Sequence, residues 1–219
     1  MSTFKKRTRD VDDQPVPPSK RGPKVDVELT RRRKSDILHE AARLFDRHGY
    51  HRINMENIAQ ATGLKKPTLY HYIRSKDQIL FEIQEIIMTT LLDSLNHRRE
   101  KKMSPVDILH GMFRDVFQIM HDYPGFVRVF FESMREIQDE RRVEVRTSRR
   151  AYLSGVIEVV AEGMKQKLLR DADPRLVALC LMGACNWSYQ WYRPDRDASP
   201  LELADQCWEI AASGVLARP

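Results

Sequence analysis

Side chains that can hold phosphate oxygens and base edges are concentrated in one short segment of the N-terminal third. A helix that begins at Lys66 or Pro67 would direct its backbone amides and its dipole toward such acceptors. Tyrosine hydroxyl groups in the same segment can donate hydrogen bonds to phosphates, although a tyrosine can equally brace a helical core. The side chains concerned are those of Lys65, Lys66, Thr68, Tyr70, His71 and Tyr72.

Three helices are expected to position this segment. The first covers residues 31–47, where apolar residues recur at helical spacing and Gly49 follows as a stop. The second begins after Asn54, a good N-cap, and ends at Gly63. The third begins near Pro67, since proline is tolerated in the first turn of a helix. Two short helices joined by a glycine-containing turn and supported by a longer one form a helix-turn-helix.

Net charge is distributed unevenly along the chain. Residues 1–80 contain 18 Lys and Arg against 10 Asp and Glu, whereas the other residues contain 19 against 21. The excess positive charge of the N-terminal third favours a polyanionic partner such as nucleic acid. A solvated basic surface without a partner would give the same count.

The rest of the chain is also expected to be helical, so the predicted fold class is all-α. Residues 1–30 are rich in proline and charge and are interpreted as a flexible basic arm; residues 31–77 form the helix-turn-helix domain, and residues 78–219 form a larger effector-binding and dimerisation domain. The arm offers basic clusters at 19–24 and 31–34, which would either enter a minor groove or only raise non-specific affinity. The further predicted helices cover 76–98, 105–121, 125–137, 140–169, 174–192 and 200–216.

A dimer interface is predicted on the last two helices. Residues 177–191 are apolar on nearly every side, which indicates burial on more than one face. A second subunit would cover one face and form a four-helix bundle, whereas a monomer could bury the same helix in its own core. The interface residues that we expect are Leu181, Ala184, Cys185, Ala204, Trp208 and Ala211.

Aromatic and methionine residues recur at helical spacing in the middle of the chain. Such stripes can line an apolar ligand cavity between helices, although they more often form ordinary core. The residues of these stripes that are expected to line an effector pocket are Phe113, Phe117, Met120, Phe130 and Met134. Four residues from later segments are expected to join them: Arg149, Tyr152, Trp187 and Trp191.

Residues 49–77 closely resemble the N-terminal signature of the TetR family of transcriptional regulators. The residues that carry the match are Gly49-Tyr50, Asn57-Ile58-Ala59, Ala61, Gly63, Thr68-Leu69-Tyr70-His71-Tyr72 and Ser75-Lys76-Asp77. The resemblance implies a dimeric regulator, most often a repressor, that reads a palindromic operator and releases it when a small effector binds. It places the DNA contacts on Lys66, Pro67, Thr68, Tyr70, His71, Tyr72 and Lys76, to which Asn54 and Lys65 are added here.

The chain departs from the family pattern in two places. Lys65 stands where relatives often have a Ser or Thr that caps the recognition helix, and Met55 and Glu56 stand where relatives place DNA-contacting residues. Base preference therefore cannot be transferred from any relative.

A second resemblance concerns residues 186–194, which contain Trp191-Tyr192-Arg193-Pro194. They are similar to a segment in TetR regulators of lipid, steroid and aromatic-acid catabolism, several of which answer to acyl-CoA thioesters. The resemblance implies a small hydrophobic effector, with an acyl-CoA among the candidates. Its phosphates would need cations, and Arg141, Arg142, Arg146, Arg149 and Arg150 are candidates unless they form a solvated face.

Other classes of protein are disfavoured. The chain lacks the nucleophile elbow, P-loop, dinucleotide-binding and zinc-protease motifs, so no catalytic residue, metal or cofactor is expected. Its three cysteines form no C-x-x-C pair, its longest apolar run is too short for a membrane span, and its N-terminus lacks the apolar core of a signal peptide. We therefore expect a cytoplasmic protein. An architectural DNA-coating protein without an effector is the main alternative.

Overall fold

The computed structural model describes residues 27–193 and 198–217. In this part of the chain the secondary structure consists of nine α-helices and three 3-10 helices, without a named β-strand, which confirms the all-α class. The elements are α1 (Val27–His48), η1 (Tyr50–Arg52), α2 (Met55–Ala61), α3 (Lys66–Tyr72), α4 (Lys76–Glu100), α5 (Pro105–Asp122), α6 (Phe126–Glu132), η2 (Met134–Glu136), α7 (Asp139–Lys165), α8 (Pro174–Asn186), η3 (Trp187–Gln190) and α9 (Pro200–Ala212).

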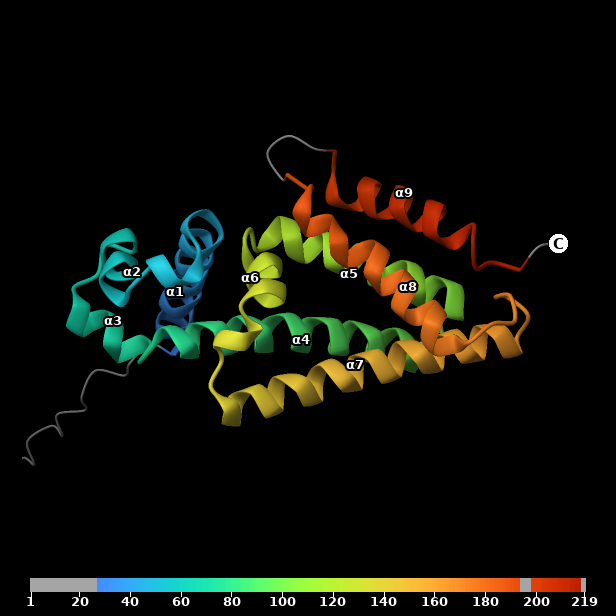
Figure 1. Ribbon diagram of the computed structural model, residues 1–219, viewed down its shortest axis with the longest axis horizontal. Coiled ribbons are helices and arrows are strands. Elements are labelled where there is room, and N and C mark those ends of the chain that lie inside the picture. Colours follow the sequence, from blue (N-terminus) through green and yellow to red (C-terminus); the bar gives the residue numbers. More distant parts are fainter. Residues whose placement is uncertain (1–26, 194–197, 218–219) are drawn as a thin grey trace, which may run out of the picture.

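Helices α1, α2 and α3 form the predicted helix-turn-helix at one end of the molecule (Figure 1). Asn54 caps α2 through a capping box, in which its Oδ1 accepts hydrogen bonds from the backbone N–H groups of Glu56 and Asn57, each at 2.9 Å. The chain turns at Gly63, whose φ of 67° lies in the left-handed region that favours glycine. The buried side chain of Leu69 then anchors α3 to the core of the domain.

Helix α4 joins the two parts of the chain. It begins at Lys76, where Ser75 caps it, and continues without a break from the helix-turn-helix into the C-terminal part, where it lies beside α7 (Figure 1). The predicted division after residue 77 falls in its first turn. Its buried isoleucines, Ile79, Ile83 and Ile87, belong to one continuous core, so a tilt of α4 would be felt in both parts.

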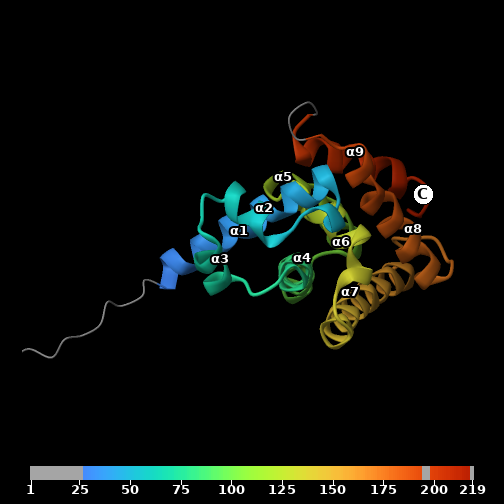
Figure 2. The same cartoon turned by 60° about the vertical axis from the view of Figure 1, so that its left-hand side comes forward.

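The C-terminal part is built around α5. This helix packs against α4, α7, α8 and α9, and its most extensive contact is with α9 (Figures 1 and 2). Phe113 and Phe117 of α5 are completely buried. No helix in the described ranges is long and apolar enough to span a membrane.

The start of the first helix and the course of the predicted helix 125–137 differ from the prediction. The first helix begins at Val27, so residues 27–30, assigned to the flexible arm, are helical; the remainder of that arm, with the cluster at 19–24, lies outside the described residues. The predicted helix 125–137 divides at Ser133 into α6 and η2. This interruption is not signalled by a proline or a glycine, since residues 126–137 contain neither.

The last three predicted helices are shorter than expected. Helix α7 ends at Lys165, because Lys167 adopts a left-handed φ of 59°. Helix α8 ends at Asn186 and continues as the tighter η3, while α9 ends at Ala212. In each case the apolar pattern continues beyond the helix because the following loop also packs on the core.

Candidate DNA-binding surface and ligand cavity

Helix α3 presents most of the predicted DNA-contacting side chains to solvent. Its inner side is held by Leu69, which is fully buried, and Tyr72 is half-buried against the core. Lys65 stands in place of the usual Ser or Thr, and no side chain caps the N-terminus of α3, so the backbone amides there are open to an acceptor. The exposed residues are Lys65, Lys66, Pro67, Thr68, Tyr70 and His71.

A shallow groove lies beside this helix. Lys66 and Tyr70 line it together with Asn54, Glu56 and Lys76. The Nζ atom of Lys66 lies 3.8 Å from a carboxylate oxygen of Glu56, and both side chains are exposed. Glu56 therefore offsets part of the positive charge at this surface, and a phosphate that approaches Lys66 must compete with it.

Lys76 is held more tightly than a surface lysine. Its Nζ donates a hydrogen bond of 2.7 Å to the backbone oxygen of Tyr50 and lies 4.0 Å from the centre of the Tyr50 ring. Burial lowers the pKa of the Lys76 ammonium group. The remaining N–H donors of Lys76 can still face the groove.

The basic cluster at residues 31–34 belongs to α1 instead of a free arm. Arg31 and Arg32 both pair with Glu28 at 3.0 Å, and Lys34 pairs with Glu82 of α4 at 2.8 Å. These charges therefore stabilise the helix and its contact with α4, and they are less available to DNA than the sequence suggested.

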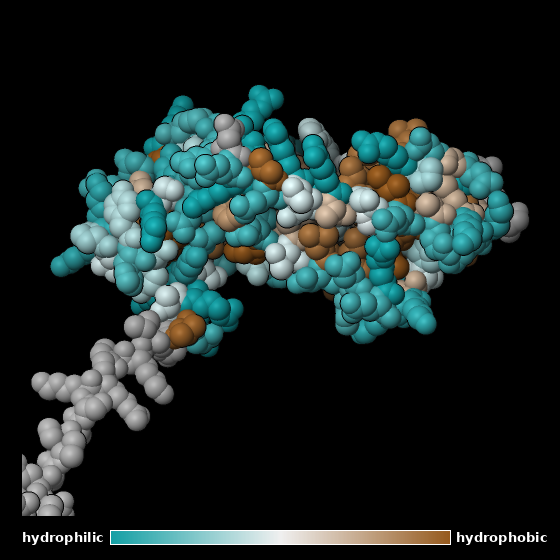
Figure 3. Space-filling view, turned by 90° about the horizontal axis from the view of Figure 1, so that it is seen from below, coloured by the Kyte–Doolittle hydropathy of each residue, from teal (hydrophilic) through white to brown (hydrophobic). Residues whose placement is uncertain are grey.

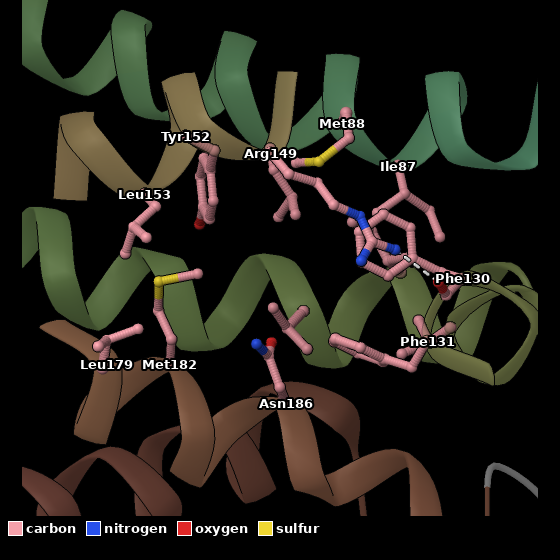
Figure 4. A pocket seen from close by; sticks show the side chains of 14 residues that line it. Ile87, Met88, Phe130, Phe131, Arg149, Tyr152, Leu153, Leu179, Met182 and Asn186 are labelled. Atoms are coloured by element: carbon pink, nitrogen blue, oxygen red, sulfur yellow. Dashed lines mark hydrogen bonds between the residues drawn. The ribbon is translucent and has the colours of Figure 1, made fainter. Parts of the chain in front are cut away.

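A cavity of about 220 Å³ lies among α4, α5, α6, α7 and α8 (Figure 4). Its wall is apolar except for three groups, which come from α7 and α8: the guanidinium of Arg149, the hydroxyl of Tyr152 and the amide of Asn186. The apolar lining residues are Ile87, Met88, Leu91, Val116, Ile119, Val127, Phe130, Phe131, Leu153, Leu179 and Met182.

Arg149 extends from α7 into this cavity without an acidic partner in the described ranges (Figure 4). Its Nη2 donates to the side-chain oxygen of Gln84 at 2.8 Å and to the backbone oxygen of Phe130 at 2.5 Å, and its guanidinium carbon lies 3.8 Å from the centre of the Phe130 ring. Its Nε is buried and has no hydrogen-bond partner among the described residues. Burial lowers the pKa of Arg149 to about 10.

The structure brings three of the predicted pocket residues to this cavity: Phe130, Arg149 and Tyr152. The other six lie elsewhere. Phe113 and Phe117 contact Trp208 and Tyr192 in the core, and Met120 faces a second depression, between α1 and α6. The remaining three are Met134, half-buried in η2, and the exposed Trp187 and Trp191.

Residues that sequence reasoning missed come from all five helices of the cavity wall, and three of them belong to α8. Leu179, Met182 and Asn186 line the cavity at the spacing of one helical stripe. That stripe was hidden because α8 is apolar on almost every side. Among the arginines proposed to bind phosphates, only Arg149 lines the cavity, whereas Arg141 lies 3.4 Å from a carboxylate oxygen of Asp77.

The predicted dimer interface requires a correction. Leu181, Cys185, Ala204 and Trp208 are buried inside the single chain, because they point from α8 and α9 toward α5 and α7, so they cannot meet a second subunit. The two other predicted residues lie outward: Ala184 is exposed and Ala211 is half-buried.

An outward apolar stripe runs along each of these two helices. Along α8 and into η3 the residues recur at spacings of four, three, one and three, and on α9 they recur at four, three and one. We call these residues the outer face; they are Leu176, Cys180, Gly183 and Ala184 of α8, Trp187 of η3, and Leu203, Cys207, Ile210 and Ala211 of α9. On a different side of the molecule, the one on which α7 lies in Figure 1, Figure 3 shows hydrophobic residues among the C-terminal helices and a mostly hydrophilic end formed by α1–α3.

The cavity and the helix-turn-helix are connected through α6. Val127 and Phe130 of α6 line the cavity, while Arg128 donates a hydrogen bond of 2.6 Å from its Nε to Asp46 of α1. At the start of α6, Gly125 has a φ of 88°, and a Cβ atom there would lie 3.0 Å from the backbone oxygen of Ala42. The close approach of α6 to α1 therefore depends on this glycine (Figure 2).

Two family models match the chain. "Bacterial regulatory proteins, tetR family" matches residues 37–83, and "Tetracyclin repressor-like, C-terminal domain" matches residues 102–215, about half of the chain. The first covers the helix-turn-helix and the start of α4, and the second covers α5 to α9 and therefore most of the cavity wall.

Similar proteins and structures cover most of the chain. The HTH-type transcriptional repressor KstR2 of Mycolicibacterium smegmatis is 23% identical over 84% of this chain and 90% of its own length. The regulator PfmR of Thermus thermophilus has a TM-score of 0.73 at 26% identity, covering 80% of this chain and 96% of its own. AibR in complex with isovaleryl coenzyme A and operator DNA has a TM-score of 0.70 at 27% identity, covering 81% and 97%. None of these names describes an enzyme, in agreement with the sequence.

Proposed function

The chain belongs to the TetR family of bacterial regulatory proteins, and from this premise we propose that it is a homodimeric repressor of transcription that a small hydrophobic effector releases from DNA. The observation that carries the proposal is the position of α6, which lines the cavity on one side and is ion-paired to α1 of the helix-turn-helix on the other.

Recognition of DNA would depend on α3. Its uncapped N-terminus and the exposed groups of Lys66, Thr68 and His71 can face base edges, while Tyr70 and Lys76 can hold phosphates. In a two-fold dimer, two such helices enter successive major grooves about 34 Å apart. The operator is therefore a palindrome whose half-site spacing matches the separation of the two helices.

The effector would occupy the cavity between α4 and α8. The apolar lining fits a hydrocarbon body, and the few polar groups can orient it. AibR, a structural neighbour, was crystallised with isovaleryl coenzyme A and operator DNA. By analogy, a hydrophobic acid or its coenzyme A thioester is the effector class for this chain.

Release would follow from a movement of α6 and α4. A ligand that spreads the cavity wall pushes Phe130 and Phe131, and α6 transmits the shift to α1 through the Arg128–Asp46 pair and the close contact at Gly125. The ligand stabilises a conformation in which the two recognition helices no longer match successive grooves. Both half-site contacts are then lost together.

Replacing Asp46 by asparagine is expected to weaken the link between cavity and DNA. The substitution removes the charge that holds Arg128 at 2.6 Å but leaves the groups of α3 unchanged. Allosteric coupling typically changes affinity by about 5- to 150-fold, and we expect the variant to lose most of that factor. The measurement is the ratio of operator dissociation constants with and without saturating effector.

Asp36→Asn is the matched control, because Asp36 is an exposed acidic residue of the same helix and the charge change is identical. The control should keep the wild-type ratio. An unchanged ratio in Asp46→Asn would show that this ion pair does not transmit the effector signal.

The experiment that tests the proposed function is selection of the purified protein on a randomised duplex library at physiological salt. Enrichment of a palindrome would support a dimeric, sequence-specific regulator. Retention that depends on salt but enriches no sequence would favour the architectural DNA-coating protein.

A further inference from the structure

We propose that the effector presents a carboxylate to Arg149 inside the cavity. This inference rests on the proposed function, because it concerns the ligand of the same cavity, and it narrows the effector class to apolar molecules with an acidic group at one end. The inference is based on the hydrogen-bond partners that Arg149 has, and lacks, in the ligand-free protein.

Arg149 is a partly buried cation, with a buried Nε, and it has no counterion in the described part of the chain. The acceptors of its Nη2 are the neutral oxygens of Gln84 and Phe130, and its Nε, which is also a donor, has none. Removing an unpaired charge from water is costly, and a buried N–H without a partner adds to that cost. An anion that enters the cavity would relieve both penalties, which gives it a large share of its binding energy.

A purely structural role for Arg149 is poorly supported by its contacts. The backbone oxygen of Phe130 already accepts a hydrogen bond of 2.9 Å from the amide of Gln84. The end of α6 would therefore keep a partner if Arg149 were absent. The guanidinium also has a planar fork that matches the two oxygens of a carboxylate, which two neutral acceptors do not require.

The other polar groups of the cavity indicate which further functional groups the ligand carries. The hydroxyl of Tyr152, three residues beyond Arg149 on α7, makes no hydrogen bond with the described residues, and the amide of Asn186 projects from α8 (Figure 4). Burial raises the pKa of Tyr152 well above its usual value, so this group stays a neutral hydroxyl. It suits a ligand oxygen such as a ketone or an alcohol at a distance from the carboxylate.

The volume of about 220 Å³ points to a compact ligand, since sites for drug-sized molecules measure about 300–1,000 Å³. A carboxylate of this kind has two sources. It is either a free acid, or the distal carboxylate of a dicarboxylic acid whose other end is a thioester outside the cavity. Both sources present the same group to Arg149.

Binding of paired ligands to the wild-type protein tests the charge requirement. The free acids octanoate and cyclohexanecarboxylate are compared with octanol and cyclohexylmethanol, and adipoyl-CoA is compared with hexanoyl-CoA, by melting temperature and by calorimetric titration. We expect at least one acidic member to bind about 10- to 100-fold more tightly than its neutral partner, the range for a hydrogen-bonded charge pair. If the acid is preferred in the pairs of free acid and alcohol, the carboxylate is that of a free acid. If adipoyl-CoA is preferred to hexanoyl-CoA, it is the distal carboxylate of a thioester.

Variants of Arg149 assign the effect to this side chain. Arg149→Met keeps an apolar chain of similar length and should remove the preference for the acid while binding of the neutral partner is unchanged. Arg149→Lys keeps the charge without the fork and should retain part of the preference, which also preserves the test if the methionine variant is poorly folded. Arg146→Met, an exposed arginine one turn earlier on α7, is the control and should behave as wild type.

The inference is overturned if no acidic ligand binds more tightly than its neutral partner, or if Arg149→Met and Arg149→Lys keep the full preference. Neither result affects selection of DNA by the free protein, which tests the proposed function separately. Conversely, a failed selection with an intact, Arg149-dependent preference for acids would reject the repressor and leave the carboxylate site standing.

Discussion

Replacing Lys66 by alanine is expected to weaken operator binding by about 30- to 20,000-fold and to change the preferred base at one position of each half-site. A side chain that holds a base edge contributes about 1–3 kcal/mol of discrimination, and a two-fold dimer loses this amount twice. Lys66 is exposed at the open N-terminus of α3, where such a contact is geometrically available. The measurement is selection and titration of the variant on the library used for the wild type.

The Tyr70→Ala substitution tests whether Tyr70 contacts phosphates, which affects affinity for every sequence, or base edges, which affects the preferred sequence. The Tyr70 side chain is exposed beside Lys66, and its loss should weaken binding to every duplex without altering the preferred sequence. Lys101→Ala is the control, because Lys101 is an exposed lysine at the far end of α4. A Lys66→Ala protein with wild-type affinity and preference would remove Lys66 from the recognition surface.

The Ile210→Asp substitution is expected to convert the dimer into a monomer and to lower operator affinity by more than about 100-fold. Ile210 is 76% exposed on the outer face of α9, where a charge would be buried against the second subunit without a partner. Two DNA-binding domains that are no longer connected lose the effective concentration that the dimer provides at the second half-site. Sedimentation gives the oligomeric state, and titration with the selected duplex gives the affinity.

Val143→Asp is the matched control, since Val143 is an aliphatic residue of α7 that is 61% exposed and lies outside the outer face. It should remain a dimer with normal affinity for DNA. If Ile210→Asp stayed dimeric under the same conditions, the interface would have to lie on a different surface.

Helix ends that depend only on neighbouring residues could be predicted from the sequence. Asn54, Gly63 and Pro67 mark the ends of the short helices, and the structure uses the first as a cap, the second at a positive φ and the third in the first turn of α3. Each of these signals acts within a few residues of its position. The helix-turn-helix could therefore be predicted from the sequence without knowledge of any tertiary contact.

The inward and outward faces of α8 could not be separated in this way. Cys180 and Ala184 are exposed and Leu181 and Cys185 are buried, yet all four are small or apolar. Their hydrophobicity therefore does not distinguish the inward side of α8 from the outward side. Only the packing of α5 and α7 on one side decides which stripe is inside. This is why four of the six predicted interface residues belong to the core of the single chain.

The cavity was only partly predictable for a related reason. Its wall comes from five helices, and no residue of α5 that was predicted for it lies there. Phe113 packs α5 against Trp208 of α9, and Phe117 packs it against Tyr192, which follows η3. Arg149 was recognisable as one of several cations, but its isolation depends on the position of Gln84, 65 residues away. A single sequence without contacts cannot supply that information.

The central claim, that occupation of the cavity controls binding to DNA, is tested most directly by reciprocity. The dissociation constant of the best cavity ligand from the paired series is measured on the free protein and on the protein saturated with the selected duplex. Because the two binding events are linked, the duplex must weaken ligand binding by the same factor by which the ligand weakens duplex binding. We predict equal factors of about 5- to 150-fold. Equal affinity of the ligand for the free and the DNA-bound protein would contradict the account.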